Sequence, residues 1–487
     1  MTKKTLSKVT RRQALKTGAA AAAVGAAGPA LTGTAFAGAE GDRIIAAAKA
    51  AVPGGVDVSG IMWSNYQVAT SGSIKDFGDA TNIKLPKIQD ISTFEIPQRA
   101  MAEALSKSPE FDFFHVDSNM IPSLASAGLL EPLDEYMKKA NFKIDAVGNF
   151  GKFMTYKDKT YGIPTDGNVM VQFIRKDLFE NPDERKAFAD KHGREMTWPE
   201  TWEEELELMN FFTRPEDNLW GSANLRDRGS SLVWWYMYLY SAGGFPFTDD
   251  MEPNINTEEA IYATQTFLNV KSASHPEAAG WGTPQMIPRI INGNAFSCQY
   301  WDGIIALAEN PDKSKTAGKW TYGDVPGSKF SGKLIKRSCS TPVVSMLVNR
   351  HSPRKEAMAY MAIYMGTAAE SAKIVGDRVN TFHDPWHVDH FKAGSLPAKT
   401  YTPGGMAAIK RNLEITTPPI FMTGLLEFET ELKRNISEAY AGDKTAKQVN
   451  ADTTDAWTRS IRRIGKRRLK EELKTYKSLF PSVDVPT

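Results

Sequence analysis

The stretch Phe111-Asp112-Phe113-Phe114-His115-Val116-Asp117 decides the fold of this chain. Its apolar character predicts a buried β-strand that ends in the polar loop 117–119. Upstream, residues 56–63 alternate as a strand does, residues 82–85 form a second strand candidate, and residues 98–106 show a helical pattern. Strand, helix and strand at this spacing predict parallel pairing, so the chain is expected to be an α/β protein.

Helices and strands continue to alternate towards the C-terminus. Residues 120–127 predict a helix that ends at Gly128, because glycine readily adopts the left-handed conformation of a helix C-terminus. Apolar runs predict strands at 169–174, 295–299 and 340–349. Further helices are expected at 201–212, at 234–240, from 256 or 257, and at 353–365. No internal repeat or linker separates these elements, so the lobes are expected to be interwoven.

A second stretch, Gly128-Leu129-Leu130-Glu131-Pro132-Leu133-Asp134-Glu135-Tyr136, follows the first strand and helix. It resembles the G-L-L-x-P-L-D-x-Y stretch of carbohydrate-type extracellular solute-binding proteins, the maltose-binding-protein-like class. Other stretches resemble the same class in the same order, namely 161–164 with 173–179, 198–204, 241–244 and 292–295. Their joint order is specific, and the resemblance covers residues 56–464.

This resemblance implies an α/β, two-lobed periplasmic-binding-protein fold of type II, with a ligand cleft between lobes that are joined by crossing segments. Likeness to the class places the crossings near 169–173, 337–345 and 379–382. The N-terminal lobe is expected to comprise residues 38–168 and 343–380, and the C-terminal lobe residues 169–342 and 381–487. The stretch 376–390 is longer and more polar than the pattern of the class.

The first 37 residues look like a twin-arginine export signal. Arg11 and Arg12 precede a stretch rich in alanine and glycine, and small residues precede an expected cleavage after Ala37. An N-terminal amphipathic helix is the alternative, but six basic residues without an acidic one favour a signal. No apolar stretch reaches the ~20 residues that a membrane-spanning helix needs. The protein is therefore expected to be exported and soluble in the periplasm.

Cleavage leaves 450 of the 487 residues and changes the formal net charge from +2 to about −4. A chain this close to neutral has no broad field for nucleic acid, so no nucleic-acid partner is expected. Residues 459–477 predict a basic helix, either a solvated face or a docking surface. Cys298 and Cys339 lie in strand-like runs, where they could form a disulfide or pack as free thiols.

Aromatic residues beside polar loop residues are typical of a sugar site, because rings stack on pyranose faces while polar groups bind hydroxyls. The ends of strands are also where open α/β sheets bind ligands. The candidate ligand contacts are Trp63, Asn65, Tyr66, Asp117, Ser118, Asp166, Asn168, Trp234, Trp235, Tyr300, Trp301, Asp302, Arg337, Asn380 and Trp386. Trp63 and Trp301 resemble loop positions that the class uses, and Arg337 resembles a position at a crossing.

Some of these residues have alternative roles. The aromatic residues at 234–240 could pack in the core, and Asp117 could cap a helix. If Arg337 enters the pocket, its guanidinium would favour an acidic ligand, whereas it could instead close a salt bridge between the lobes.

Three of the seven histidines, His383, His387 and His390, fall within eight residues. On one helix face they could bind zinc, but Pro385 opposes a continuous helix, so no metal or other cofactor is predicted. The motifs G-x-S-x-G, Walker A, G-x-G-x-x-G and H-E-x-x-H do not occur. An exported metal-dependent or carbohydrate-active hydrolase is the alternative, because the separation of carboxylates in space cannot be read from sequence.

The prediction is therefore a binding protein and not an enzyme. It is expected to be the substrate-binding component of an ABC importer, which captures a carbohydrate or polyol, an acidic sugar included, by lobe closure. Its expected partners are this small molecule and an ABC transporter permease in the membrane, and it is expected to be a monomer.

Overall fold

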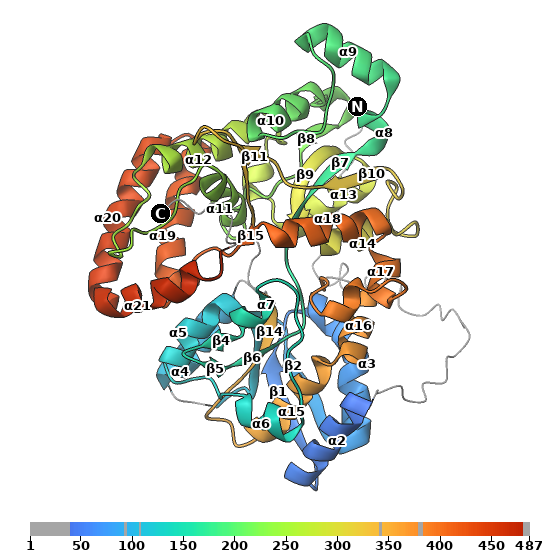
Figure 1. The fold of residues 1–487 in the computed structure, drawn as a ribbon, viewed down its shortest axis with the longest axis vertical. Helices are drawn as coiled ribbons and strands as arrows, with labels where there is room; N and C mark the ends of the chain where they lie inside the picture. The colour runs from blue at the N-terminus through green and yellow to red at the C-terminus, as the bar shows by residue number, and fades with distance from the viewer. Residues whose placement is uncertain (1–38, 92–94, 107–108, 340–342, 378–382, 481–487) are drawn as a thin grey trace, which may run out of the picture.

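Each lobe of the protein is organised around its own β-sheet, and the chain passes between the two sheets more than once (Figure 1). The computed structural model describes residues 39–91, 95–106, 109–339, 343–377 and 383–480. The expected signal with Ala37, the candidate Asn380 and the expected crossing at 379–382 lie outside the described residues. The predicted two-lobed α/β architecture is confirmed.

The sheet of the first lobe has the strand order β2-β1-β3-β14-β6. β1 pairs in parallel with β2 and β3, which confirms the predicted parallel arrangement. β14 arrives from much later in the sequence and runs antiparallel to β3 and β6. The strands are β1 (Val56–Ile61), β2 (Ile83–Gln89), β3 (Phe113–Asp117), β6 (Gly162–Pro164) and β14 (Val344–Val348). The helices of this lobe are α2 (Ala39–Ala51), α3 (Ser64–Thr81), α4 (Ile96–Ser106), α5 (Ile121–Ser126), α6 (Asp134–Lys139), α7 (Phe150–Phe153), α15 (Lys355–Met365) and α16 (Ala368–Gly376).

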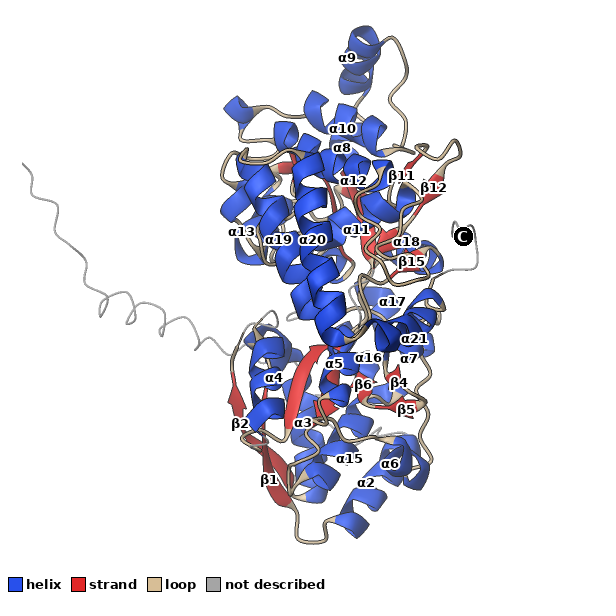
Figure 2. Ribbon diagram, turned by 90° about the vertical axis from the view of Figure 1, so that its left-hand side faces the viewer, coloured by secondary structure: helices blue, strands red, loops and turns tan. Residues whose placement is uncertain are grey.

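The sheet of the second lobe has the order β10-β7-β9-β8, with β7 antiparallel to both of its neighbours. Its strands are β7 (Met170–Arg175), β8 (Trp220–Ser222), β9 (Ala295–Trp301) and β10 (Trp320–Gly323). Helices surround the strands of both lobes, and α19 and α20 run side by side (Figure 2). The helices of this lobe are α8 (Lys176–Phe179), α9 (Pro182–His192), α10 (Trp202–Phe211), α11 (Leu232–Ser241), α12 (Glu258–Asn269), α13 (Thr283–Asn292), α14 (Gly303–Ala308), α18 (Pro403–Glu414), α19 (Leu425–Ala441), α20 (Ala446–Ile464) and α21 (Lys466–Lys477).

Connecting segments carry the chain from one sheet to the other. Residues 165–169 link β6 of the first sheet to β7 of the second. A second connection lies between β13 (Ser338–Cys339), which pairs with β15 (Thr416–Thr417), and β14. The short helices η5 (Val388–Phe391) and α17 (Leu396–Thr400) pack against α16, whereas α18 packs against β10 and β7. Side chains on these segments are therefore placed between the lobes.

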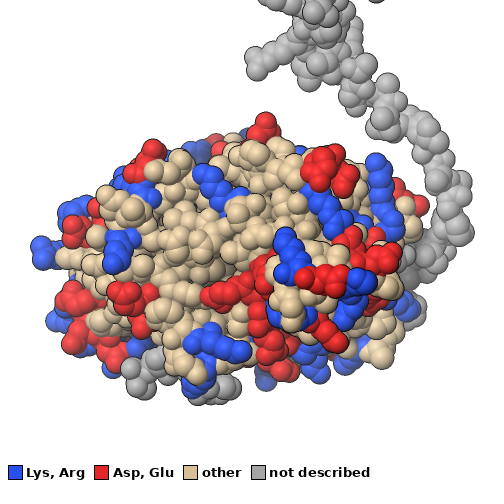
Figure 3. Space-filling model, turned by 90° about the horizontal axis from the view of Figure 1, so that it is seen from above, with Lys and Arg blue, Asp and Glu red and all other residues tan. Residues whose placement is uncertain are grey.

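The basic C-terminal stretch differs from its expected form as one continuous helix. α20 ends at Ile464 and α21 begins at Lys466, because Gly465 adopts a φ of 109° that interrupts the helical backbone. Seen from the end of the second lobe near α9, acidic and basic side chains are interspersed (Figure 3). In the described part of the chain, no helix combines the length and apolarity that crossing a bilayer requires.

The two cysteines are buried free thiols. Cys298 lies in β9 and Cys339 in β13, and neither side chain is exposed to solvent. Of the two alternatives that the sequence left open, packing as thiols is therefore the one that the structure shows.

Helix α10 begins with a capping box that fixes its first turn. The Thr201 hydroxyl accepts a hydrogen bond from the Glu204 backbone N–H at 3.2 Å, and the Glu204 carboxylate accepts one from the Thr201 N–H at 3.3 Å. We expect Thr201→Ala to lower the free energy of unfolding by about 1 kcal/mol, since the substitution leaves the Glu204 N–H without its partner. Urea unfolding would measure this loss, and an unchanged midpoint would contradict the role of the cap.

Candidate ligand-binding site

Four aspartates gather where strands end and connecting segments pass between the lobes. Asp117 is the last residue of β3, Asp166 follows β6, and Asp302 follows β9. Asp384 reaches the same place from the last third of the chain. Asp166, Asp302 and Asp384, which we call the aspartate cluster, expose at most 2% of their surface.

Hydrogen bonds tie the aspartate cluster to the connecting segments. The backbone N–H of Asp384 donates to Oδ1 of Asp166, and the N–H of Val169 donates to Oδ1 of Asp302 at 3.0 Å. The carboxyl groups of Asp302 and Asp384 also influence each other's pKa, while Oδ2 of Asp302 and Oδ1 of Asp384 have no hydrogen-bond partner in the protein.

Burial controls the protonation of the aspartate cluster. Loss of solvation raises the pKa of Asp302 to about 7 and holds the pKa values of Asp166 and Asp384 well above the ordinary value. Neighbouring carboxyl charges add to this effect, since Asp302 raises the pKa of both other members. The cluster therefore retains protons at pH values where exposed aspartates are ionised.

Two neutral histidines and a tyrosine adjoin the aspartate cluster. The Tyr66 ring contacts the rings of His115 and His383 edge to face, with centroids 5.0 Å and 4.9 Å apart. Burial lowers the pKa of His115 to about 3 and that of His383 well below its usual value, so both rings are uncharged at neutral pH. Nε2 of His115 lies 2.7 Å from Oγ1 of Thr165, in the segment that links the lobes.

Asp117 faces charged side chains of the second lobe that the sequence analysis missed. Desolvation raises its pKa to about 7, the charge of Glu429 raises the pKa further, and the charge of Lys433 lowers it. Glu429 and Lys433 lie on α19 and form an ion pair of 3.1 Å. In the sequence they form a glutamate–lysine pair at spacing i, i+4, which is usual on a solvated helix face, so nothing distinguished them from a surface pair.

Several buried polar atoms at this place lack a hydrogen-bond partner within the protein. They include Nδ1 of His115, Oγ of Ser118, Oδ1 of Asn119 and Oδ2 of Asp166, on residues that are at least nine-tenths buried. Buried polar groups are nearly always paired in native proteins, with protein groups, water or a ligand. A polar molecule that fills this place would satisfy them.

The predicted aromatic contacts divide between the lobes. Trp63 precedes α3 and lies edge to face with Tyr66 at 6.0 Å, whereas Trp301 ends β9 and lies edge to face with Trp234 at 5.7 Å. Trp63 and Trp301 are partly exposed, while Trp234 is fully buried. Trp63 and Trp301 are therefore the tryptophans of this set that retain a surface for a ligand.

Three other predicted aromatic contacts, Trp235, Tyr300 and Trp386, are buried in this structure. Trp235 is buried and donates from Nε1 to Oγ1 of Thr264 on α12 at 2.9 Å, so it packs inside the second lobe. Tyr300 is 1% exposed, because its ring packs edge to face against Trp301 at 5.3 Å and against Trp234 at 6.3 Å. Trp386 is fully buried and packs against His387 and His390.

The remaining predicted residues lie near the connecting segments. Asn65 is a partly exposed residue of the first turn of α3, and Ser118 is buried directly after β3. Asn168, just before β7, is 6% exposed and has a φ of 146°. Arg337, between β12 (Ile335–Lys336) and β13, is 6% exposed and donates to the carbonyl of Lys336 at 2.9 Å.

The three clustered histidines do not converge. His383 contacts Tyr66, whereas the rings of His387 and His390 lie 5.7 Å apart beside Trp386. Nδ1 of His390 accepts hydrogen bonds from the backbone N–H groups of residues 386 and 387, and its Nε2 lies 3.0 Å from Oγ of Ser371. Within the described ranges, no group of three histidine, cysteine or acidic side chains is arranged to hold a metal ion.

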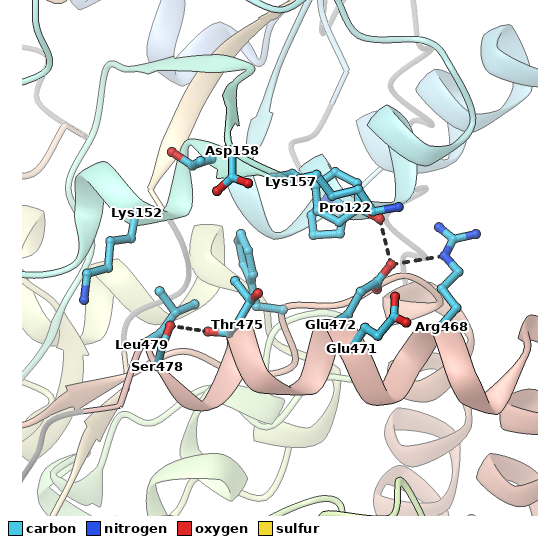
Figure 4. Close-up of a pocket in the computed structure, with 13 residues that line it drawn as sticks. Pro122, Lys152, Lys157, Asp158, Arg468, Glu471, Glu472, Thr475, Ser478 and Leu479 are labelled. Carbon is cyan, nitrogen blue, oxygen red and sulfur yellow. Dashed lines mark hydrogen bonds and ion pairs between the residues drawn. The ribbon is translucent and has the colours of Figure 1, made fainter.

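Helix α21 makes a second contact between the lobes, which we call the α21 contact. Glu472 accepts hydrogen bonds from the Tyr156 hydroxyl at 2.7 Å, from the Thr423 N–H at 2.8 Å and from Arg468 Nε at 3.1 Å. Tyr156 belongs to β4 (Thr155–Tyr156) of the first lobe. A cavity of 390 Å³ opens beside this contact, with Lys152 and Asp158 on one side and α21 on the other (Figure 4).

These features define a two-lobed α/β protein with buried, unpartnered polar atoms beside the segments that join its lobes. The profile of the family described as bacterial extracellular solute-binding protein matches residues 63–370, so the chain belongs to that family.

Solved structures of sugar-binding and polyol-binding proteins share the fold. A maltose-bound MalE3 of T. maritima is 15% identical with a TM-score of 0.70, covering 82% of this chain and 99% of that one. An ABC transporter solute-binding protein of Agrobacterium radiobacter in complex with ribitol is 16% identical with a TM-score of 0.70, covering 84% and 98%. A solute-binding protein of Agrobacterium vitis with bound D-mannitol is 17% identical with a TM-score of 0.69, covering 84% and 99%.

Proposed function

We propose that this protein is the substrate-binding component of an ABC importer and that it captures a carbohydrate or polyol between its lobes. The observation that carries the proposal is the set of buried, unpartnered polar atoms at the C-terminal ends of β3 and β6, which lie at the same edge of the first sheet, together with partly exposed Trp63 and Trp301. Acceptors and donors of this kind bind hydroxyl groups, and tryptophan faces stack on sugar rings. Maltose, ribitol and D-mannitol in proteins of the same fold support this ligand class.

Closure of the lobes explains how such a site binds its ligand. Asp117 of the first lobe faces Glu429 and Lys433 of the second, so a molecule between them contacts both lobes. Enclosure excludes water and strengthens each polar contact, and the ligand favours the closed state by its higher affinity for that state. We further propose that a permease in the membrane receives the solute and that the protein works in the periplasm as a soluble monomer.

A thermal-shift screen of monosaccharides, oligosaccharides, polyols and sugar acids tests the proposal. We expect at least one compound to raise the melting temperature strongly, because a ligand at 100 times its dissociation constant adds ~2.7 kcal/mol to stability. Trp63→Ala and Trp301→Ala should each reduce this shift. Phe330→Ala, which removes an aromatic ring that is 44% exposed in another part of the second lobe, is the matched control. A panel without any stabiliser would contradict the proposal, and unchanged shifts in both tryptophan variants would contradict the assigned stacking surfaces.

One observation favours a second candidate function. The buried carboxyl groups of Asp302 and Asp384, whose pKa values are raised by burial, have the chemistry of a general acid, which carbohydrate-active hydrolases use. Prolonged incubation with each oligosaccharide that binds, followed by chromatography, distinguishes the two functions. We expect the oligosaccharide to be recovered intact, and release of shorter sugars at a constant rate per protein would favour the hydrolase.

A further inference from the structure

Asn168 has an unusual backbone conformation in the connection between β6 and β7, which can be followed between the two lobes in Figure 1. Its φ is 146°, whereas the other seven non-glycine residues with positive φ in the described part of the chain have φ values between 48° and 61°. The left-handed helical region, which asparagine adopts readily, covers φ values of about 50° to 70°. A φ of 146° falls far outside it, in a region that glycine occupies almost alone, so Asn168 is strained.

The residue before Asn168 is fixed to the first lobe. The Gly167 N–H donates to the Asp384 carbonyl at 2.8 Å. The segment that contains Asp384 is itself bound to the first lobe, because the N–H of Val147, which precedes α7, donates to the Trp386 carbonyl at 2.9 Å. Gly167 therefore moves with the first lobe.

The residue after Asn168 is fixed to the second lobe. The Val169 N–H donates to Oδ1 of Asp302 at 3.0 Å, and the Asp302 N–H donates to the Val169 carbonyl at 3.1 Å. Asp302 follows β9 of the second sheet, and Val169 is fully buried. Asn168 therefore lies between an anchor on the first lobe and an anchor on the second.

The backbone torsions at Asn168 must change when the lobes part. Peptide units are rigid, so the torsions between two anchored residues absorb a rotation of one lobe relative to the other. Tyr156 and Glu472 join the lobes in the described arrangement, which is therefore the closed one. In this arrangement Gly167 has little room to shift and relieve the strain, since a β-carbon there would lie 2.6 Å from the Pro385 carbonyl oxygen. A strained conformation persists when its surroundings impose it in this way.

Resting on the proposed function, we propose that Asn168 is a strained hinge residue that opposes lobe closure and thereby limits the affinity for the ligand. The strain is present while Tyr156 and Glu472 join the lobes, and it is relieved when the lobes part. Ligand binding has to supply the free energy of this strain, so the protein binds more weakly than it would with glycine at this position. Asn168 acts through its backbone in this role and needs no contact with the ligand.

Single-molecule energy transfer in the protein without ligand tests the proposal. The two dyes are attached to Lys75→Cys of α3 and Lys186→Cys of α9, since these lysine side chains are 72% and 76% exposed and the two native thiols are buried. We expect Asn168→Gly to raise the ratio of closed to open molecules at least fivefold, because glycine adopts this φ without strain. A ratio that does not rise, including a closed form that stays undetectable in the glycine variant, overturns the proposal.

The matched control is the same substitution at Asn141, which has a φ of 49° and follows α6 inside the first lobe. Asn141→Gly should leave the ratio of closed to open molecules unchanged, because its torsions do not lie between the lobes. A rise of equal size in Asn141→Gly would show that added backbone freedom, and not strain in the connection, causes the effect, and this result would also overturn the proposal.

Binding measurements separate the hinge role from a direct contact between Asn168 and the ligand. Calorimetry with maltose, ribitol and D-mannitol compares the wild type with Asn168→Gly and Asn168→Ala. For a compound that binds, the glycine variant should bind at least five times as tightly as the wild type, and the alanine variant should not bind more tightly, because its β-carbon retains the strain. Weaker binding by both variants would identify a side-chain contact, which overturns the proposal but leaves the proposed function intact. If none of the three compounds binds, the energy-transfer result alone decides the role of Asn168, and silence from the whole thermal-shift panel counts against the proposed function only.

Discussion

Replacement of Asp302 by asparagine is expected to stabilise the protein at pH 8 by roughly 2 to 4 kcal/mol relative to the wild type, because asparagine cannot acquire the buried charge. The pKa of Asp302 is about 7 in the folded protein, against an ordinary value of 3.8. As the pH rises above about 4, the unfolded chain loses this proton first and the folded state binds more protons. Stability therefore falls between pH 4 and pH 7, and the full loss is present above pH 7.

Urea unfolding at pH 4.5, 6 and 8 measures this effect. The wild type should lose stability across the series while Asp302→Asn loses much less, and the two proteins should be nearly equal at pH 4.5. Asp112→Asn is the matched control, because Asp112 is also fully buried but is paired with Arg354 at 3.0 Å. Its replacement should lower stability at pH 8. Parallel pH profiles for wild type and Asp302→Asn would contradict the prediction.

Glu472→Ala is expected to have the second large effect, a loss of roughly 3 kcal/mol in the free energy of unfolding together with weaker ligand binding. The carboxylate is only 7% exposed and accepts hydrogen bonds from Tyr156, Thr423 and Arg468. Removal of an acceptor for several buried donors leaves those donors unsatisfied, one of them charged. Because Tyr156 belongs to the first lobe, the loss also weakens the closed arrangement.

A matched pair of variants separates the contribution of lobe closure to ligand binding from a general loss of stability. Tyr156→Phe removes the hydroxyl that joins the lobes and so destabilises the closed state. A loss of about 1.4 kcal/mol in the stability of the closed state raises the dissociation constant of the ligand tenfold. Tyr240→Phe removes a hydroxyl that lies 2.6 Å from the hydroxyl of Tyr476, also on α21, but within the second lobe. We expect calorimetry to show weaker ligand binding only for Tyr156→Phe. Equal dissociation constants in the two variants would show that the α21 contact does not act on closure.

The architecture could be predicted from the sequence where the signal is local. The apolar run before Asp117 is β3, the run at 169–174 is β7, and the helix expected at 201–212 is α10, which Thr201 caps. Each of these elements depends on residues that are neighbours in sequence and on the burial of one face. The sequence pattern alone is therefore enough to predict them.

The candidate site could be predicted only in part, because it depends on distant contacts. Asp166 and Asp302 were both candidates in the sequence, but Asp166 meets Asp384 across 218 positions of sequence, a contact that no local pattern shows. Tyr300 and Trp301 were both candidates, and only their packing against Trp234 on a distant helix shows that Tyr300 is buried while Trp301 stays partly exposed. Trp235 lies in a helix that is apolar on all sides, so periodicity could not show which ring faces inward.

The α21 contact also provides a position from which occupancy could be observed in real time. α21 is fixed to its own lobe by an ion pair of 2.6 Å between Lys470 and Asp250, and it rests on the other lobe through Glu472. Asp158 and Glu471 line the same cavity from opposite lobes (Figure 4). Fluorophores at these two positions would change their separation whenever the lobes part, so the protein could serve as an optical sensor for its own solute.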